Sequence, residues 1–361
     1  MACTLKDIAQ RAGVSTVTVH KSIYGKPGIG EATRKRVLEI VKEMNYSVNP
    51  VASSLKRDAL NIAVISPTLE SQFNYFFRAI DTGIQNAEKE LRSFKVSVLR
   101  YSCGDTWQSQ TRILDDILQH SDIHGVVIYC WDDTKLNAHF EKLHQKGIPV
   151  ITFHSDAINS CRIACVSAPN ENTGYLAAEL MSHITPQGGR IIVMGGNKML
   201  KVLRDNTLGF YSCIQRYRSD LSLLEINDKN SLENLKSELR KLFCAFDNIV
   251  GVYCNSARNN IPLCEVLHEM ALNNKIKVIC SDVFEELAPY FEDGTITATM
   301  WQDPQSQSYK AIKLMYEYLT TRTSSTDRSD VRIGIVMKSN FVDYLGTPLP
   351  SAMYMEGLKK I

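Results

Sequence analysis

The sequence predicts an α/β protein with two lobes of doubly wound parallel sheet and a small all-helical domain before them. Short runs rich in valine and isoleucine recur along most of the chain, and helical patterns separate them. The break Ser167-Ala168-Pro169-Asn170 divides this series near its middle, which favours two lobes over one large sheet. The first 60 residues differ, because their apolar residues follow helical spacing only.

The charged residues are unevenly distributed. The 361 residues carry a net charge of +2, yet residues 1–60 hold ten Lys/Arg against five acids, and the remainder carries a net charge of −3. A basic module on a mildly acidic body indicates contact with nucleic acid at the N-terminus. The overall composition, 44% hydrophobic and 22% charged, is typical of globular proteins and excludes collagen, coiled-coil rods and bulk disorder.

The sequence predicts neither a membrane span nor a metal site. No run approaches about 18 apolar residues, and residues 1–7 lack the basic and then apolar profile of a signal peptide, so we expect a cytoplasmic protein. The ten cysteines form no C-x-x-C pair, and the eight histidines show no metal-binding motif. We therefore expect reduced, mostly buried thiols and no metal or cofactor.

The N-terminal region predicts a helix-turn-helix. Thr4 and Asp7 have capping-box spacing, and the first helix ends at Gly13. Ser15 can cap a second helix, and a third follows over about 31–44. The outward positions of the second helix carry short groups and a cation, which suit base edges, thymine methyls and phosphates. These positions are Thr16, Val17, Thr18, His20 and Lys21.

Several motifs lie between residues 5 and 50: Leu5-Lys6-Asp7-Ile8-Ala9, Ala12-Gly13-Val14-Ser15, Thr18-Val19, Gly25-Lys26-Pro27-Gly28, Thr33-Arg34-Lys35-Arg36-Val37 and Asn45-Tyr46-Ser47-Val48-Asn49-Pro50. In combination they resemble the lactose/galactose-repressor family of transcription regulators. The resemblance implies a headpiece that binds double-stranded operator DNA as a homodimer, with Thr16, Val17 and Lys21 reading bases. Where the family usually has Ser-Arg, this chain has His20-Lys21. Lysine lacks the bidentate guanine contact of arginine, so we expect an operator that differs from the usual family consensus.

The same resemblance implies a hinge helix at residues 49–56, which is too short to be stable alone in water. Leu55 occupies the position of a leucine that enters the minor groove in the family. A plain polar linker is the alternative interpretation. We expect the DNA-contacting residues to be Thr4, Ser15, Thr16, Val17, Thr18, His20, Lys21, Asn49, Leu55 and Lys56.

The body of the chain supplies the strands and helices of the two lobes. The strand-like runs are 61–65, 96–99, 125–128, 149–153, 190–194, 249–253, 277–280 and 296–300. The helical patterns lie at about 75–91, 107–119, 134–146, 171–184, 204–216, 231–245, 257–272 and 304–321. Ligands of open parallel sheets bind at the carboxyl ends of the strands. Aromatic, amide and carboxylate side chains follow these ends, including His154, which suits a neutral polyhydroxylated ligand.

The body also resembles the sugar-binding core that these repressors share with periplasmic ribose- and galactose-type binding proteins. Asn74-Tyr75-Phe76-Phe77 is similar to their Asn-Pro-Phe-Phe loop, with Tyr in place of Pro. The segment from Arg204 to Gly209-Phe210 is similar to their Arg-x-x-x-x-Gly-Phe element, although the family arginine aligns at Arg204 or at Asn206. The effector contacts that the resemblance implies are Asn74, Phe76, Phe77, Asp132, Arg204, Asn206, Asn255, Asp282 and Gln302.

These observations divide the chain into a headpiece at 1–48, a hinge at 49–60 and an effector-binding core at 61–361. We expect an N-terminal lobe of about 61–167 and 299–332, and a C-terminal lobe of about 168–298 and 333–361. The C-terminal stretch has too few heptads for a tetramer helix, so we expect a homodimer.

The interpretation is a DNA-binding transcription regulator, a repressor, whose operator affinity is controlled by a monosaccharide or a derivative bound between the lobes. The alternatives are a sugar-binding receptor without a DNA role, a purine-responsive regulator and a sugar-modifying enzyme. We do not expect an enzyme, because the sequence has no G-x-S-x-G elbow, P-loop or G-x-G-x-x-G motif.

Overall fold

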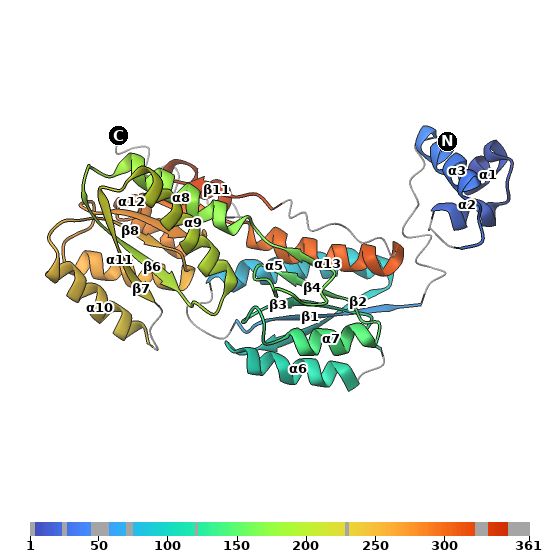
Figure 1. Ribbon diagram of the computed structural model, residues 1–361, viewed down its shortest axis with the longest axis horizontal. Helices are drawn as coiled ribbons and strands as arrows, with labels where there is room; N and C mark the ends of the chain where they lie inside the picture. The colour runs from blue at the N-terminus through green and yellow to red at the C-terminus, as the bar shows by residue number, and fades with distance from the viewer. Residues whose placement is uncertain are drawn as a thin grey trace.

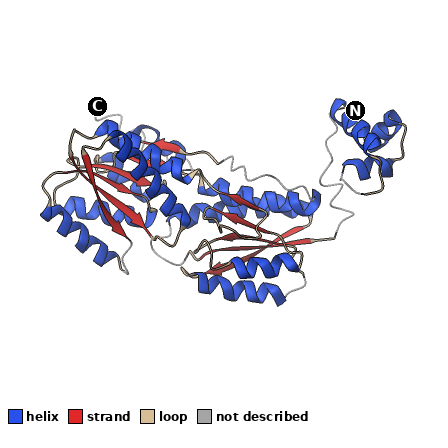
Figure 2. Ribbon diagram, viewed as in Figure 1, coloured by secondary structure: helices blue, strands red, loops and turns tan. Residues whose placement is uncertain are grey.

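Figure 1 shows the protein as a computed structural model, which describes residues 4–23, 27–44, 58–69, 75–119, 122–227, 231–321 and 331–345. A three-helix unit at the N-terminus is followed by two α/β lobes. Figure 2 shows the helices of each lobe on both faces of its sheet, so the predicted fold class is confirmed.

The N-terminal unit is a helix-turn-helix with a third supporting helix. It contains α1 (Leu5–Ala12), α2 (Thr16–Ile23) and α3 (Glu31–Glu43). Thr4 and Asp7 form the predicted capping box, and Gly13 ends α1 with a φ of 63°, a left-handed conformation that suits glycine. Ile8, Val19 and Val37, one from each helix, are fully buried together and form the small core.

The first lobe, which we call the N-terminal lobe, has a five-stranded parallel sheet in the order β2-β1-β3-β4-β5. Its strands are β1 (Leu60–Pro67), β2 (Val96–Cys103), β3 (Gly125–Tyr129), β4 (Val150–Phe153) and β5 (Ala164–Val166). The helices α6 (Trp107–Gln119) and α7 (Asn137–Gln145) cover one face, and α5 (Tyr75–Leu91) covers the other (Figure 1). The distant helix α13 (Pro304–Thr321) lies beside α5, and Ser308 Oγ donates to the Ile80 carbonyl at 2.8 Å.

The C-terminal lobe has a six-stranded sheet in the order β11-β10-β9-β8-β6-β7, parallel except for β11. Its strands are β6 (Gly189–Gly196), β7 (Leu221–Asn227), β8 (Ile249–Cys254), β9 (Lys277–Ser281), β10 (Ala298–Trp301) and β11 (Gly334–Val336). The helices are α8 (Asn170–Ile184), α9 (Lys201–Tyr217), α10 (Leu232–Ala245), α11 (Asn260–Glu269) and α12 (Ala288–Glu292). Apolar residues of α8 and α9 pack on one face of the sheet, and those of α10 and α11 pack on the other.

All eight predicted strands are present, and the described residues contain three further strands that were not predicted. β5 and β11 span three residues each, which is shorter than the runs that a sequence pattern can identify. β7 lies at the sheet edge and carries exposed polar residues among its apolar ones, so its pattern is weak. The predicted helix at 257–272 is divided into a short 3-10 helix, Ala257–Asn259, and α11.

The division of the chain into domains is a proposal, and β10 bears on it. This strand pairs with β9 and β11 in the second sheet, so the chain returns to the N-terminal lobe only after Trp301. The predicted boundary at 299 therefore moves to the residues that follow Trp301.

Candidate functional site

The second helix of the N-terminal unit presents a mixed surface to solvent. Thr16, Val17 and His20 are exposed, and Val17 retains 62% of its accessible surface although it is apolar. Thr18 and Lys21 are half-buried. An exposed valine between polar neighbours suits contact with a thymine methyl group in the major groove.

Thr4, Ser15 and Thr18 take part in helix capping. Thr4 Oγ1 accepts from the Asp7 amide at 3.4 Å, and Ser15 Oγ accepts from the Thr18 amide at 3.0 Å. Capping at both helix starts fixes the orientation of α2, so these residues position the surface that Val17 and Lys21 occupy. Asn49, Leu55 and Lys56 lie outside the described residues, as does Asn74.

The remaining effector candidates come from both lobes and lie close to the carboxyl ends of strands. Asp132 follows β3, Asn255 follows β8, Asp282 follows β9 and Gln302 follows β10. All four side chains are buried. The structure therefore places polar groups where open parallel sheets bind ligands.

An aromatic cluster lines the N-terminal lobe at this place. The ring centroid of Phe76 lies 4.4 Å from that of His154, and Tyr129 stacks on His154 at 5.5 Å. Phe77 makes edge contacts with Tyr129 and Trp131 at 5.5 and 6.0 Å. Such rings offer the flat apolar faces on which the C–H face of a sugar or the plane of a base can stack.

His154 was not among the predicted effector contacts, although its position at a strand end was a signal. It is 5% exposed, and its φ of 61° is left-handed, a conformation that costs energy for a residue with a side chain. Burial lowers the pKa of His154 to about 3, although the hydrogen bond with the Gln307 side chain raises it in part. The ring is therefore neutral. Its Nδ1 has no hydrogen-bond partner.

Asp282 and Gln302 are polar side chains that follow strands of the second sheet, β9 and β10. Asp282 also has a left-handed φ, 65°, and its amide donates to the Met300 carbonyl at 2.7 Å. Burial raises the pKa of Asp282 to about 7, although the Gln302 side chain lowers it in part. Asp282 Oδ1 and Gln302 Oε1 are buried without hydrogen-bond partners.

Two asparagines add further unpartnered amide atoms. Asn255 Nδ2 donates to the Leu203 carbonyl at 3.1 Å and to Thr207 Oγ1 at 2.8 Å, which leaves Asn255 Oδ1 without a partner. Asn206 is fully buried, and neither its Oδ1 nor its Nδ2 has a partner. Buried polar atoms normally find partners, so this set indicates a place for a polar ligand.

The main contacts of Asp132 and Arg204 are with residues outside the cluster of unpartnered polar atoms. Asp132 Oδ1 accepts from the amides of Thr134 and Lys135, both at 2.9 Å. Burial acts to raise the pKa of Asp132, but the hydrogen bonds to its carboxylate have the larger combined effect, so the net pKa is lowered. Arg204 forms an ion pair with Asp133 of the other lobe. Arg204 therefore bridges the lobes, whereas the buried Asn206 two residues later offers unpartnered groups.

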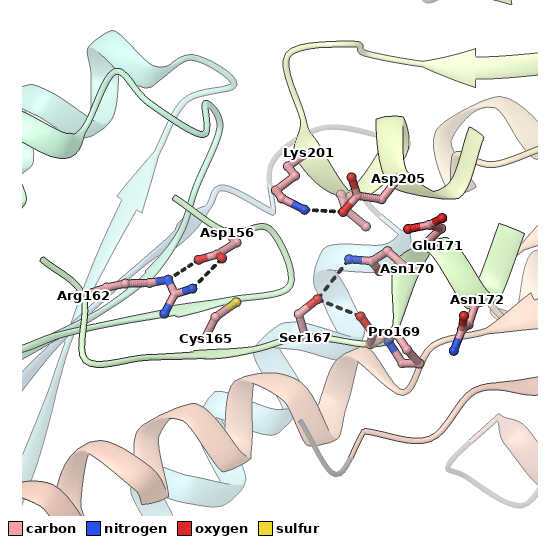
Figure 3. Close-up of a pocket in the computed structure, with 12 residues that line it drawn as sticks. Asp156, Arg162, Cys165, Ser167, Pro169, Asn170, Glu171, Asn172, Lys201 and Asp205 are labelled. Atoms are coloured by element: carbon pink, nitrogen blue, oxygen red, sulfur yellow. Dashed lines mark hydrogen bonds and ion pairs between the residues drawn. The ribbon is translucent and has the colours of Figure 1, made fainter. Parts of the chain in front are cut away.

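A separate cavity of about 390 Å³ lies beside the crossover from β5 to α8. Figure 3 shows both of its cationic side chains paired with carboxylates: Arg162 with Asp156, joined at 2.7 Å, and Lys201 with Asp205. None of the predicted effector residues that the structure describes lines it. Because Arg162 and Lys201 are already paired, the strand-end cluster is the better candidate site.

The part of the chain that the structure describes contains no group of three His, Cys, Asp or Glu side chains that could hold a metal ion. None of the helices within these described ranges is both long and apolar enough to cross a membrane.

Comparisons with known proteins match the two parts of the chain to two families. Residues 4–49 match the bacterial regulatory proteins of the lacI family, and residues 62–323 match the periplasmic binding protein domain. The chain is 26% identical over 264 residues to the ribose operon repressor of Haemophilus influenzae, in an alignment that covers 69% of this chain and 75% of the relative. It is 29% identical over 216 residues to the transcriptional repressor PurR of Aliivibrio salmonicida, covering 58% of this chain and 60% of that relative.

Solved structures show the same fold. A glucose-galactose binding protein from Geobacillus stearothermophilus superposes with a TM-score of 0.69 at 21% identity, covering 79% of this chain and 99% of that one. A LacI transcriptional regulator from Bacteroides fragilis, described as putative, superposes with a TM-score of 0.71 at 17% identity, covering 80% and 99% of the two chains.

Proposed function

This chain belongs to the lacI family of bacterial regulatory proteins and has a periplasmic binding protein domain as its core, and from this we propose its function. It is a transcription repressor that binds operator DNA as a homodimer, in the cytoplasm, and responds to a small molecule bound between its lobes. The DNA-contacting and effector-contacting residues named above are part of this proposal.

The exposed face of α2 supports the DNA-binding role. Val17 and His20 face solvent, and the first 60 residues carry the excess of basic residues. Lys21, on the same helix, supplies a charge for a phosphate or a base acceptor. Contacts with phosphates release counterions, so affinity for DNA should fall steeply with salt.

One observation carries the effector role. Buried polar atoms without partners gather at strand ends of both lobes, among them Asp282 Oδ1, Gln302 Oε1, Asn255 Oδ1 and His154 Nδ1. Leaving such atoms unsatisfied costs about 1–3 kcal/mol each, so a ligand that bonds to them would bind with a large gain. A ligand that contacts both lobes favours the closed arrangement and can shift operator affinity by that preference.

The effector is a neutral polyhydroxylated molecule, such as a monosaccharide. Acceptors and amides outnumber cations at the site, and Arg204 is already paired with Asp133. Hydroxyl groups can both donate and accept, which matches a mixed set of unpartnered atoms. A purine is the second candidate, because Phe76 and His154 present ring faces on which a flat base can stack.

The test has two arms. The purified protein selects duplexes from a random library, and gel shift then measures binding to the selected duplex. Isothermal titration calorimetry uses D-ribose, D-glucose, D-galactose, hypoxanthine and guanine. We expect a pseudo-palindromic site and heat from one sugar, and the gel shift repeated with that sugar shows whether it releases or recruits the protein.

Each arm has a control and a contrary outcome. Asp282→Ala should remove the heat but leave the gel shift intact, whereas Asp247→Ala, at an exposed carboxylate, should change neither. Absence of any selected duplex would overturn the regulator proposal. Heat from a purine alone would replace the sugar by the second candidate, and an unchanged titration with Asp282→Ala would remove Asp282 from the site.

A further inference from the structure

A parallel ring stack joins the two lobes at the start of α5. Tyr75, the first residue of α5 in the N-terminal lobe, stacks on Phe284, which follows β9 in the C-terminal lobe. The ring centroids lie 4.2 Å apart, and the planes differ by 1°. Phe284 is buried and Tyr75 is half-buried, so the stack withdraws apolar surface of both lobes from water.

An ion pair joins the same two segments one helical turn further on. Arg78 Nη2 lies 2.6 Å from Glu286 Oε1, and the Arg78 guanidinium also lies over the Tyr75 ring, 5.0 Å from its centroid. The side chains of Arg78 and Glu286 are 53% and 39% exposed, so the pair alone is a modest contact. Together the four residues link ring, cation and carboxylate across the boundary between the lobes.

These four residues adjoin the candidate effector site. Phe76, next to Tyr75, contacts His154 on one side, and Asp282 lies two residues before Phe284 on the other. Tyr75 and Phe76 both pack against the apolar core of the C-terminal lobe. Separation of the two lobes at this place would break the stack and the ion pair.

We propose that Tyr75, Arg78, Phe284 and Glu286 form an inter-lobe clamp that holds the site closed and positions its two halves. The clamp sets the balance between closed and open lobes before any effector binds. The clamp affects effector binding only through the relative position of the lobes, and its four residues make no bond to the effector. The inference does not depend on the regulatory function proposed above, because it concerns only the contact between the lobes.

Tyr75 offers an informative substitution. It is the first residue of α5, a position at which proline is well tolerated because its missing amide would have no partner within the helix. Tyr75→Pro therefore keeps the helix and removes the ring. Loss of the stack should raise the open-to-closed ratio about two- to tenfold. Loss of the ion pair alone should raise it by no more than about fivefold.

Single-molecule energy transfer on the full chain tests the clamp, without DNA or effector. Dyes are attached to p-acetylphenylalanine introduced at Lys142 on α7 and Lys241 on α10, which are exposed and lie on different lobes. We expect Tyr75→Pro and Arg78→Glu to enlarge the low-transfer, open population. The exchanged pair Arg78→Glu/Glu286→Arg should return it toward the original value, which a merely structural defect would not do.

Arg92→Glu is the matched control, because Arg92 pairs with Glu88 inside one lobe and its loss should leave the transfer distribution unchanged. An unchanged distribution in both Tyr75→Pro and Arg78→Glu overturns the clamp, as does a failure of the exchanged pair to restore closure. Neither outcome affects the gel-shift or calorimetric tests of the regulator, and failure of those tests leaves the clamp standing.

Discussion

Arg204 at the start of α9 and Asp133 after β3 form an ion pair that joins the C-terminal lobe to the N-terminal lobe. Asp133 is 13% exposed and Arg204 is 39% exposed, and Arg204 Nη1 also donates to the carbonyls of Lys198 and Met199 at 2.9 and 3.3 Å. The arginine is thus held by its own loop and presented to the opposite lobe. This arrangement suits a residue that positions the lobes, and it leaves no unpaired cation at Arg204.

If the pair acts as a unit, its two members should show non-additive effects. Arg204→Gln should raise the open population by less than about fivefold, since the guanidinium is 39% exposed and solvent screens its attraction to Asp133. Adding Asp133→Asn should change it no further, because the interaction is already lost. The measurement is the energy-transfer distribution with the labels described above. Arg240→Gln is the control, because it breaks a pair with Glu269 inside one lobe at an arginine that is 39% exposed, as Arg204 is. Additive effects of the two inter-lobe substitutions would contradict this role.

Asp282 should make stability depend on pH. Burial raises its pKa to about 7, far above the value of an exposed aspartate, so the folded protein holds a proton that the unfolded chain releases. Stability from this group is present at low pH and is lost as pH rises from about 4 to about 7. Asp282→Asn removes this loss, and the variant should exceed the original protein in stability at about pH 8 by a few kcal/mol, but by little at about pH 4.

Urea unfolding at these two pH values measures the difference. Asp247→Asn, at an exposed position, is the control and should follow the original protein at both. A constant difference between Asp282→Asn and the original protein at the two values would show that the Asp282 carboxyl does not titrate in this range.

The sequence predicts most of the fold because burial leaves a pattern. Strands such as β3 and β8 are buried on both faces and read as continuous apolar runs, and Thr4, Gly13 and Ser15 mark helix ends by their own chemistry. The pairing of β10 with β9 rather than with the first sheet, and the return of α13 to α5, depend on contacts between distant segments. No local pattern encodes such contacts.

The site was predictable to the extent that it follows the strand ends. That rule places Asn255, Asp282 and Gln302 together with no knowledge of the fold beyond parallel sheets. The partner of Arg204 and the stack of Tyr75 on Phe284 depend instead on how one lobe sits against the other. Tyr75 and Phe284 lie more than 200 residues apart in the sequence, and Arg204 and Asp133 lie 71 apart. The residue types in both contacts are common on any protein surface.

His154 should have the opposite pH dependence to Asp282. Burial lowers its pKa to about 3, so the unfolded chain takes up a proton that the folded protein cannot, and stability falls as pH drops from about 6.5 toward 3. His154→Gln removes this loss. The free energy of unfolding in urea should decline less in the variant than in the original protein between about pH 7 and about pH 4. His144→Gln, at an exposed histidine, is the control and should decline as the original protein does. If His154→Gln also declined as much as the original protein, the folded state would not hold a buried neutral ring at His154.

Lys21 and Val17 should affect DNA binding in different ways. A lysine that meets a phosphate contributes counterion release, so Lys21→Ala should weaken binding and reduce the slope of log affinity against log salt by about 1. Val17→Ala removes an apolar contact that reads bases, so it should lower affinity for the selected duplex with the salt slope unchanged. Gel shifts at several salt concentrations separate the two. Lys142→Ala, on the N-terminal lobe, is the control, and an unchanged slope in Lys21→Ala would remove Lys21 from phosphate contact.

The close approach of α8 to α9 should not tolerate a methyl group. A Cβ at Gly174 would lie 1.8 Å from the Asn206 carbonyl oxygen, and one at Gly209 would lie 1.9 Å from the Glu171 carbonyl oxygen. Both neighbours are backbone atoms of helices, so the clash can be relieved only if α8 and α9 separate, which would also displace Asn206. Gly174→Ala should therefore destabilise the protein by at least about 1–3 kcal/mol. Gly104→Ala is the control, because the nearest atom to its Cβ, Ser109 Oγ, is 3.7 Å away. Thermal unfolding followed by circular dichroism compares the two variants, and a transition of Gly174→Ala that coincides with that of Gly104→Ala would show that the helices can separate at little cost.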